Sequence, residues 1–258
     1  MEPDVTNDTP GPTLADPLAE AVRLVQLADA RGLQVRLMGG LAFHARVRDW
    51  TAEARGRDID LATRSKDRRA LGELMSAEGY TADRRYNALY GHKQLYFVDE
   101  LRTRPVDVLV DRLEMCHTFE FVDRLAVAEV TVPPAELLLS KLQVVKINRK
   151  DVLDALALLS ELPLADGDDG GRAISLKRIT SFTSGDWGWW RTVTGNLTKL
   201  NEIEQPSRAG RAGFRAGAAV RCCGPGRGVA RRDRRGAEID EVEDAVAGRR
   251  PDRVVRGA

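Results

Sequence analysis

The chain has 258 residues, of which 43% are hydrophobic, 31% charged and 5% aromatic, as is typical of a globular protein. The apolar runs fall short of the roughly 20 residues that span a bilayer, and the acidic, polar start lacks a signal-peptide core, so we expect no membrane association. Three cysteines without zinc-site spacing exclude a disulfide framework and favour a cytoplasmic location.

The near-neutral net charge of +1 hides two different parts. Residues 205–258 carry 13 Lys and Arg against 7 Asp and Glu, a net of +6, which leaves 27 against 32 and a net of −5 for the rest. This stretch is rich in Arg and Gly, and no leucine follows Leu200. We therefore expect a low-complexity, disordered tail over 204–258. Two other interpretations stay open: an arm that binds RNA or DNA, and translation out of the ancestral reading frame.

The body begins with an expected disordered leader over 1–15. Apolar periodicity and breaker residues then predict an α/β domain over 16–132 and a helical region over 133–203. In chain order, the pattern predicts a helix from Pro17 to Ala30, a strand over 33–38, a Gly39-Gly40 turn, a helix over 41–50, a charged loop over 51–57, a strand around Ile59, a helix over 67–78, an antiparallel pair over 80–98 that turns at 87–91, a strand over 106–111, one or two strands over 121–132, and helices over 136–145, 150–159 and 187–200.

The acidic residues of two predicted strands carry the strongest chemical signal. Asp58 and Asp60 alternate with apolar residues, so both carboxylates lie on one face of their strand. Neighbouring carboxylates repel unless a cation neutralises them, so the pair predicts a Mg²⁺ site. Asp107, between Val106 and Val108, also points away from a buried face. If the two strands are neighbours, three carboxylates converge, enough to hold two divalent ions for an in-line displacement at phosphorus.

The order of these motifs resembles a known superfamily. Met38-Gly39-Gly40, then Arg57-Asp58-Ile59-Asp60-Leu61, then Val106-Asp107-Val108 resemble the nucleotidyltransferase fold of the polymerase-beta superfamily. Within it, the chain is similar to the minimal bacterial nucleotidyltransferases of the AbiE-type toxin (AbiEii) family. Pro133-Pro134-Ala135-Glu136 to Lys141, followed by Lys150-Asp151-Val152-Leu153-Asp154, resembles the helical motif of that family. The resemblance covers residues 20–200 and leaves out the tail. Seventeen residues separate Gly40 from Asp58, a longer spacing than is usual there.

The resemblance implies a mixed sheet flanked by helices, followed by a small helical region. It also implies a role for each motif residue. Gly39 and Gly40 would contact nucleotide phosphates, the turn's backbone N–H groups being suited to anions. Asp58, Asp60 and Asp107 would hold metal and act in catalysis. Lys141 would reach the triphosphate as a point charge, and Arg57 would bind phosphate or neutralise Asp58.

These expectations combine into a Mg²⁺-dependent nucleotidyltransferase with two ions, Mn²⁺ being an alternative metal. It would transfer NMP from an NTP to an acceptor hydroxyl on tRNA, a protein or a small molecule. A toxin role with a cognate antitoxin as partner follows from the resemblance alone. The alternative is a non-catalytic member of the same fold that binds a nucleotide or a partner protein.

Overall fold

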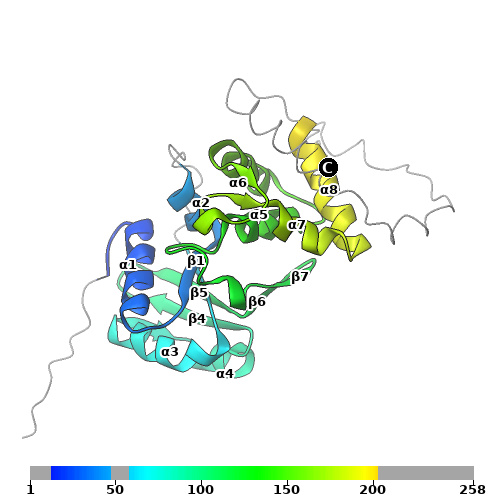
Figure 1. Cartoon of the computed structure of the whole chain (residues 1–258). Helices are drawn as coiled ribbons and strands as arrows, with labels where there is room; N and C mark the ends of the chain where they lie inside the picture. Colours follow the sequence, from blue (N-terminus) through cyan, green and yellow to red (C-terminus); the bar gives the residue numbers. More distant parts are fainter. Residues whose placement is uncertain (1–12, 48–57, 203–258) are drawn as a thin grey trace, which may run out of the picture.

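The computed structural model describes residues 13–47 and 58–202 (Figure 1). Its centre is a five-stranded sheet with the strand order β1-β2-β5-β4-β3. The strands are β1 (Val35–Met38), β2 (Ile59–Thr63), β3 (Tyr80–Ala82), β4 (Gln94–Asp99) and β5 (Arg104–Val110). β2 and β5 run parallel, while the other neighbouring pairs are antiparallel. This mixed sheet flanked by helices confirms the α/β fold class expected from the sequence.

Alternation along the strands gives the sheet two different faces. Ile59 and Leu61 of β2 and Val106 and Val108 of β5 are fully buried, and they join one hydrophobic cluster with Phe97 of β4. Helices α1 (Pro17–Ala30) and α3 (Arg68–Ala77) contribute buried leucines to the same cluster. The residues between these apolar positions, including Asp60 and Asp107, lie on the opposite face.

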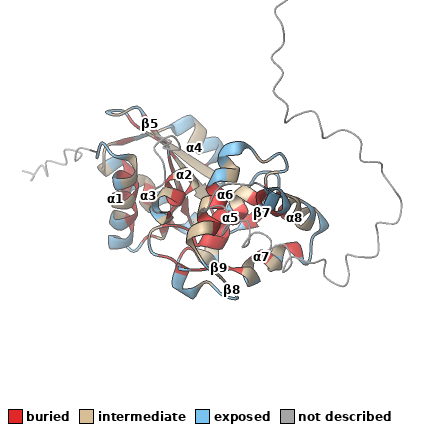
Figure 2. Cartoon of the chain, turned by 90° about the horizontal axis from the view of Figure 1, so that it is seen from above, coloured by how far each residue is buried: buried red, intermediate tan, exposed pale blue. Residues whose placement is uncertain are grey.

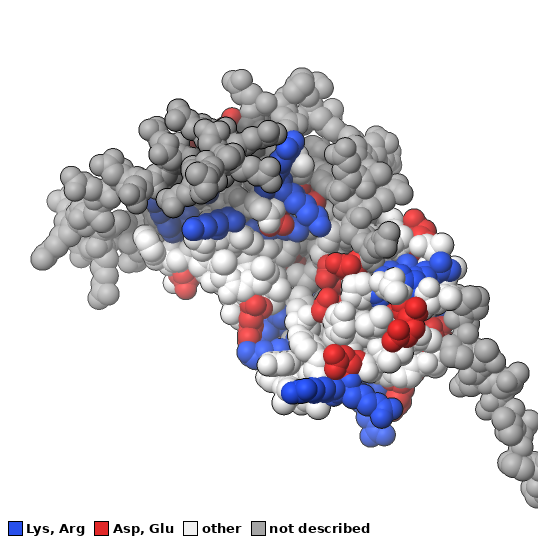
Figure 3. Space-filling view, turned by 180° about the vertical axis from the view of Figure 1, so that it is seen from behind, with Lys and Arg blue, Asp and Glu red and all other residues white. Residues whose placement is uncertain are grey.

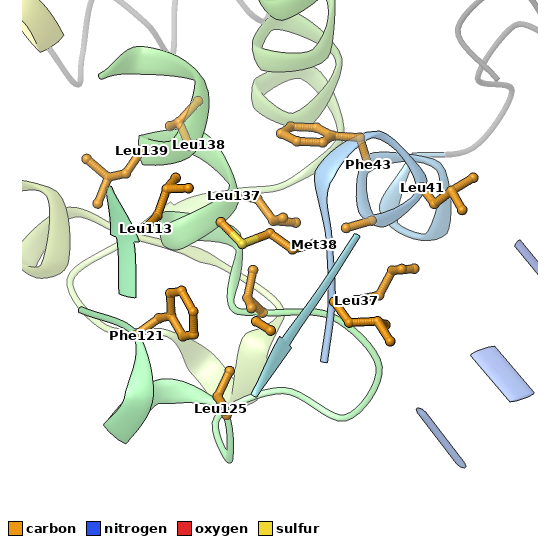
Figure 4. Close-up of a cluster of buried hydrophobic side chains, with 14 of the residues drawn as sticks. Leu37, Met38, Leu41, Phe43, Leu113, Phe121, Leu125, Leu137, Leu138 and Leu139 are labelled. Atoms are coloured by element: carbon orange, nitrogen blue, oxygen red, sulfur yellow. The ribbon is translucent and has the colours of Figure 1, made fainter. Parts of the chain in front are cut away.

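The C-terminal helices share this core. They are α5 (Pro134–Leu142), α6 (Arg149–Glu161), α7 (Leu176–Thr183) and α8 (Trp187–Glu202), and they group beside the sheet (Figure 1). α5 is buried along most of its length (Figure 2). The shared cluster is shown in Figure 4, where the labelled side chains are Leu37, Met38, Leu41, Phe43, Leu113, Phe121, Leu125, Leu137, Leu138 and Leu139. The hydrophobic core is therefore continuous across the boundary at residues 132 and 133.

Most of the predicted elements are present, with differences at their ends. α1 begins at the expected residue because the Asp16 side chain accepts a hydrogen bond from the Ala19 N–H at 2.8 Å. α2 (Gly39–Arg46) begins at Gly39, so the two glycines form its first turn and do not precede it. Two residues of the expected disordered leader are fixed to the body of the protein. Arg102 donates to the carbonyl oxygen of Thr13, and Arg104 donates to that of Leu14.

The prediction of strands over 121–132 was wrong. The described segment 125–132 forms no strand and makes one isolated parallel bridge, between Thr131 and Leu37 of β1. Its buried residues are Leu125, Ala128, Thr131 and Val132, a spacing that differs from the two-residue alternation of a strand with one buried face. A 3-10 turn, η3 (Val122–Arg124), precedes it.

Several short elements were not predicted. α4 (Arg84–Tyr90) lies between β3 and β4, in place of a tight turn, and its signal was Asp83, which caps it by accepting from the Tyr86 N–H at 2.8 Å. α7 is capped in the same way by Ser175. The remaining additions are η2 (Ser65–Asp67), η4 (Asp169–Gly171), the hairpin β6 (Arg112–Glu114) and β7 (Thr118–Glu120), and the parallel pair β8 (Leu164–Ala165) and β9 (Ile174–Ser175).

Three parts of the sequence interpretation lie outside the described residues: the leader up to residue 12, the loop with Arg57, and the tail over 204–258. Among the described helices, none combines the length and apolar character needed to cross a membrane.

A buried carboxylate joins the helical region to the rest of the chain. Glu136 of α5 has no exposed side-chain surface, and its Oε1 accepts from Nε of Arg124 at 2.9 Å and of Arg178 at 2.8 Å. Arg124 also binds Asp168 at 2.5 Å, and Arg178 donates to the Glu120 carbonyl at 2.6 Å. The acid therefore connects η3, α5 and α7 through two guanidinium groups.

We predict that Glu136→Gln lowers the free energy of unfolding by about 3 kcal/mol, because it removes the buried negative charge that Arg124 and Arg178 share and leaves Arg178 without a carboxylate partner. Glu73→Gln is the matched control, since its ion pair with Arg69 is 67% and 93% exposed and should contribute less than about 1 kcal/mol. Urea denaturation of both variants measures the difference. Equal stabilities would contradict the role of Glu136.

Candidate active site

The sheet topology brings the predicted acids together. β2 and β5 are parallel neighbours, and their register sets Asp60 directly opposite Asp107. Asp58 comes immediately before β2 and is exposed. Because residues directly opposite on paired strands share a face, the Asp60 and Asp107 carboxylates lie side by side on the polar face of the sheet. The predicted convergence of the acids required these two strands to be neighbours, and they are.

The pKa values of Asp60 and Asp107 are both raised, in part by the neighbouring acids. Burial, followed by the nearby Asp107 and Asp58 carboxylates, raises the pKa of Asp60 to about 6, and Lys141 and Lys150 only partly oppose the rise. Burial also raises the pKa of Asp107; a hydrogen bond from Gln94 opposes this rise and Asp58 adds to it. The cation-free site therefore stores repulsion between like charges.

Gly39 makes the close approach of α2 to these acids possible. Its φ is +63°, in the left-handed region that glycine adopts without a steric penalty. A Cβ atom at this position would overlap Oδ2 of Asp60 and lie 2.6 Å from its Cγ. The site thus needs glycine for two independent reasons, the backbone angle and the space that the carboxylate fills. Gly39 contacts Asp60 in spite of the long spacing between the two motifs.

Lys141 of α5 lies in a cluster of charges. Its Nζ is 2.7 Å from Oδ1 of Asp151 and 2.9 Å from Oδ2 of Asp154, both on α6, and it lies 5.3 Å from the ring centroid of Phe43. Burial lowers the pKa of Lys141, but Asp154 and Asp151 outweigh this and raise it above its usual value. Lys141 therefore stays charged, and two acids fix its position.

Lys150 was not among the predicted site residues, although the structure puts it closer to the glycine turn than the predicted Lys141. Its Nζ lies 3.9 Å from the position of a Cβ on Gly40, and its charge acts on both Asp60 and Asp154. A signal for it was present: Lys150 and Asp154 are four residues apart, which sets both on one face of a helix. Gln94 of β4, which donates to Asp107, had no comparable signal.

The chemistry of the donor set fits a hard divalent cation. Carboxylate oxygens are the ligands that Mg²⁺ prefers. A cation would relieve the repulsion from Asp107 and Asp58, which adds to burial in raising the pKa of Asp60. Within residues 13–47 and 58–202, no three His, Cys, Asp or Glu side chains already converge closely enough to enclose an ion. Like charges repel in the absence of a cation, so a bound ion would have to draw these carboxylates inward.

We predict that Gly39→Ala lowers the free energy of unfolding by about 2–3 kcal/mol, because the new Cβ collides with Asp60 and is strained at positive φ. Gly40→Ala is the matched control. Its Cβ would meet only the flexible end of Lys150 at 3.9 Å, so a change within about 0.5 kcal/mol is expected. Urea denaturation measures both variants, and a larger effect at Gly40 would refute this packing.

We predict that Asp60→Asn stabilises the cation-free protein at pH 8 by on the order of 2 kcal/mol. The ordinary pKa of the group is 3.8 and its folded value is about 6, so between these values the folded state binds more protons than the unfolded state. Stability therefore falls as pH rises through this window, and the full penalty, which the amide removes, is present above pH 6.

The measurement is urea denaturation with EDTA at pH 5 and pH 8, with the exposed Asp123→Asn as control. The gain from Asp60→Asn should shrink at pH 5. A loss of stability at pH 8 would mean that the Asp60 charge is favourably paired, and would contradict repulsion among the acids.

Comparisons with known proteins add little to these residues. No family model matches the chain, and a search of curated proteins finds no relative. Among solved structures, it is similar to the crystal structure of an antigenic nucleotidyltransferase-like protein from Paracoccidioides brasiliensis. The identity is 14% and the TM-score 0.46, over 85% of this chain and 99% of that one. At this level of likeness, an assignment of function has to rest on the chain's own side chains.

Proposed function

We propose that the chain is a Mg²⁺-dependent nucleotidyltransferase that transfers NMP from an NTP to an acceptor hydroxyl. One observation carries the proposal: Asp60 lies opposite Asp107 on parallel strands, with a glycine backbone against one of the two carboxylates. Juxtaposed, partly buried acids are costly in a domain without a cation, and they are the arrangement that metal-assisted displacement at phosphorus needs.

The triphosphate would bind on the β1 side of Asp60. The N-terminus of α2 offers backbone N–H groups there, and the side chain of Met38 at the capping position does not occupy them. Lys150 beside Gly40 supplies the nearest positive charge. Lys141 would add its charge from further away, because its ammonium group is paired with Asp151 and Asp154.

Asp58, Asp60 and Asp107 would hold the metal, which when bound supplies charge neutralisation for the phosphates and lowers the pKa of the attacking hydroxyl. Asp107, on the β5 side of Asp60, would help to activate that hydroxyl. The acceptor oxygen then forms a bond to the α-phosphorus, and the bond from the α-phosphorus to the bridging oxygen of the β-phosphate breaks. Pyrophosphate leaves beside Lys150 and the glycine turn.

Three finer parts of the proposal rest on the motif resemblance alone: the relationship to AbiE-type toxins, a cognate antitoxin as partner, and the choice among tRNA, protein and small-molecule acceptors. The cytoplasmic location rests on the few, unpaired cysteines, and a contact between the basic tail and nucleic acid rests on the Arg- and Gly-rich composition of the tail.

The purified full chain, incubated with Mg²⁺, a total RNA and protein extract and each NTP, should transfer label from the α-phosphate and none from the γ-phosphate. Asp60→Asn and Asp107→Asn keep the side-chain volume but remove the charge, so each should reduce transfer at least about 100-fold. The exposed Asp123→Asn should leave transfer unchanged.

Transfer that persists in Asp60→Asn, or that is independent of Mg²⁺, would refute the enzyme. Saturable NTP binding without transfer under any condition would favour the non-catalytic alternative. Transfer of γ-label would indicate a kinase instead.

A further inference from the structure

Gln94 of β4 makes a hydrogen bond that none of the proposed steps uses. Its side-chain amide donates to Oδ1 of Asp107. An ionised carboxylate only accepts hydrogen bonds, so the amide must present its N–H group to the acid. Within residues 13–47 and 58–202, Gln94 is the one side chain that hydrogen-bonds Asp107, and neither Asp58 nor Asp60 has such a partner. Of the three acids, Asp107 is therefore the one whose orientation a hydrogen bond fixes.

The register of the sheet explains why a side chain as long as glutamine makes this contact. In the antiparallel β4–β5 ladder Gln94 pairs with Leu109, while Tyr96 pairs with Asp107. Gln94 is thus the diagonal neighbour of Asp107 on the same face of the sheet. Diagonal neighbours on paired strands are about 7–8 Å apart, a distance that only a long side chain bridges. Because the ladder holds the backbone of β4, the amide reaches the acid from a fixed position.

The neutral charge of Gln94 distinguishes this contact from the ion pairs of the chain. The buried carboxylate of Asp99, for example, is 2.8 Å from a guanidinium nitrogen of Arg104. On the surface seen from behind in Figure 3, acidic and basic side chains are also intermixed. An arginine or lysine at position 94 would neutralise Asp107 and repel a metal ion beside it. A neutral amide orients the carboxylate and leaves its charge available to a cation.

The hydrogen bond also determines which oxygen of Asp107 is available. β5 lies between β2, which carries Asp60, and β4, which carries Gln94. The amide holds Oδ1 from the β4 side, and in the described part of the chain Oδ2 accepts no hydrogen bond. Hydrogen bonds from a second layer of residues commonly orient metal ligands in this way, and their loss costs roughly 10–100-fold in metal affinity.

We propose that Gln94 is the positioning residue of the cation site: its amide holds Oδ1 of Asp107 and reserves Oδ2 for the divalent cation. Gln94 does not bind the cation itself, so its whole effect on metal binding passes through Asp107. This inference rests on the proposed function for the presence of a cation, and it adds the residue that controls how strongly Asp107 contributes to holding it.

The test measures binding of Mn²⁺, as a spectroscopic substitute for Mg²⁺, to the full chain without NTP. Electron paramagnetic resonance measures the concentration of free Mn²⁺ during a titration. Gln94→Met keeps the length of the side chain and removes the donor, so it should weaken Mn²⁺ binding about tenfold. Gln26→Met replaces an exposed glutamine of α1 and should have no effect. Thermal melting checks that each variant is folded.

A double-mutant cycle separates positioning from a general structural role. If Gln94 acts through Asp107, the loss of affinity caused by Gln94→Met should disappear when Asp107→Ala has already removed the carboxylate. An equal loss in both backgrounds would overturn the inference, and so would unchanged Mn²⁺ binding in Gln94→Met. Both of these results leave the proposed function intact, because the unchanged protein still binds the metal. If the unchanged protein binds no Mn²⁺, the cation site and its positioning residue fail together.

Discussion

The parallel pairing of β2 with β5 is the constraint on which the rest of the site depends. It sets Asp60 beside Asp107, where burial first and then the neighbouring carboxylates of Asp107 and Asp58 raise the pKa of Asp60 to about 6. Neighbouring groups reduce the repulsion between these carboxylates only in part. Gly39 clears the space that the Asp60 carboxylate fills, and Lys141 and Lys150 lower the repulsion from a second layer. The remaining charge is what a divalent cation and a triphosphate would resolve together.

The fold could be predicted where one local pattern decides the structure. The apolar patterns of α1, α3, α5 and α6 predict helices, and α1 and α6 also have side-chain caps, while β2 and β5 follow clear alternation. Prediction failed where tertiary contacts override the local pattern. Residues 125–132 contain strand-forming residues, but their only bridge to the sheet is the one between Thr131 and Leu37 of β1. α4 replaced a turn because one side chain, Asp83, caps a helix too short to show periodicity.

The candidate site divides along the same line. Asp58, Asp60 and Asp107 could be selected from the sequence because their alternation sets them on one face, and the strand order then brings two of them together. Lys150 and Gln94 escaped because their importance depends on packing between elements far apart in the chain: Lys150 lies over Gly40, and Gln94 donates to Asp107. No local sequence pattern predicts that α6 packs on the first turn of α2.

The two lysines near α6, Lys141 and Lys150, have different surroundings and so have different roles. Lys141 is neutralised by Asp151 and Asp154, so it can hold α5 against α6 with no ligand bound, at little cost in repulsion. Lys150 contributes to the same cluster, but it lies next to a glycine backbone that leaves room for an anion. The charge of Lys150 is therefore the one that faces the β1 side of Asp60.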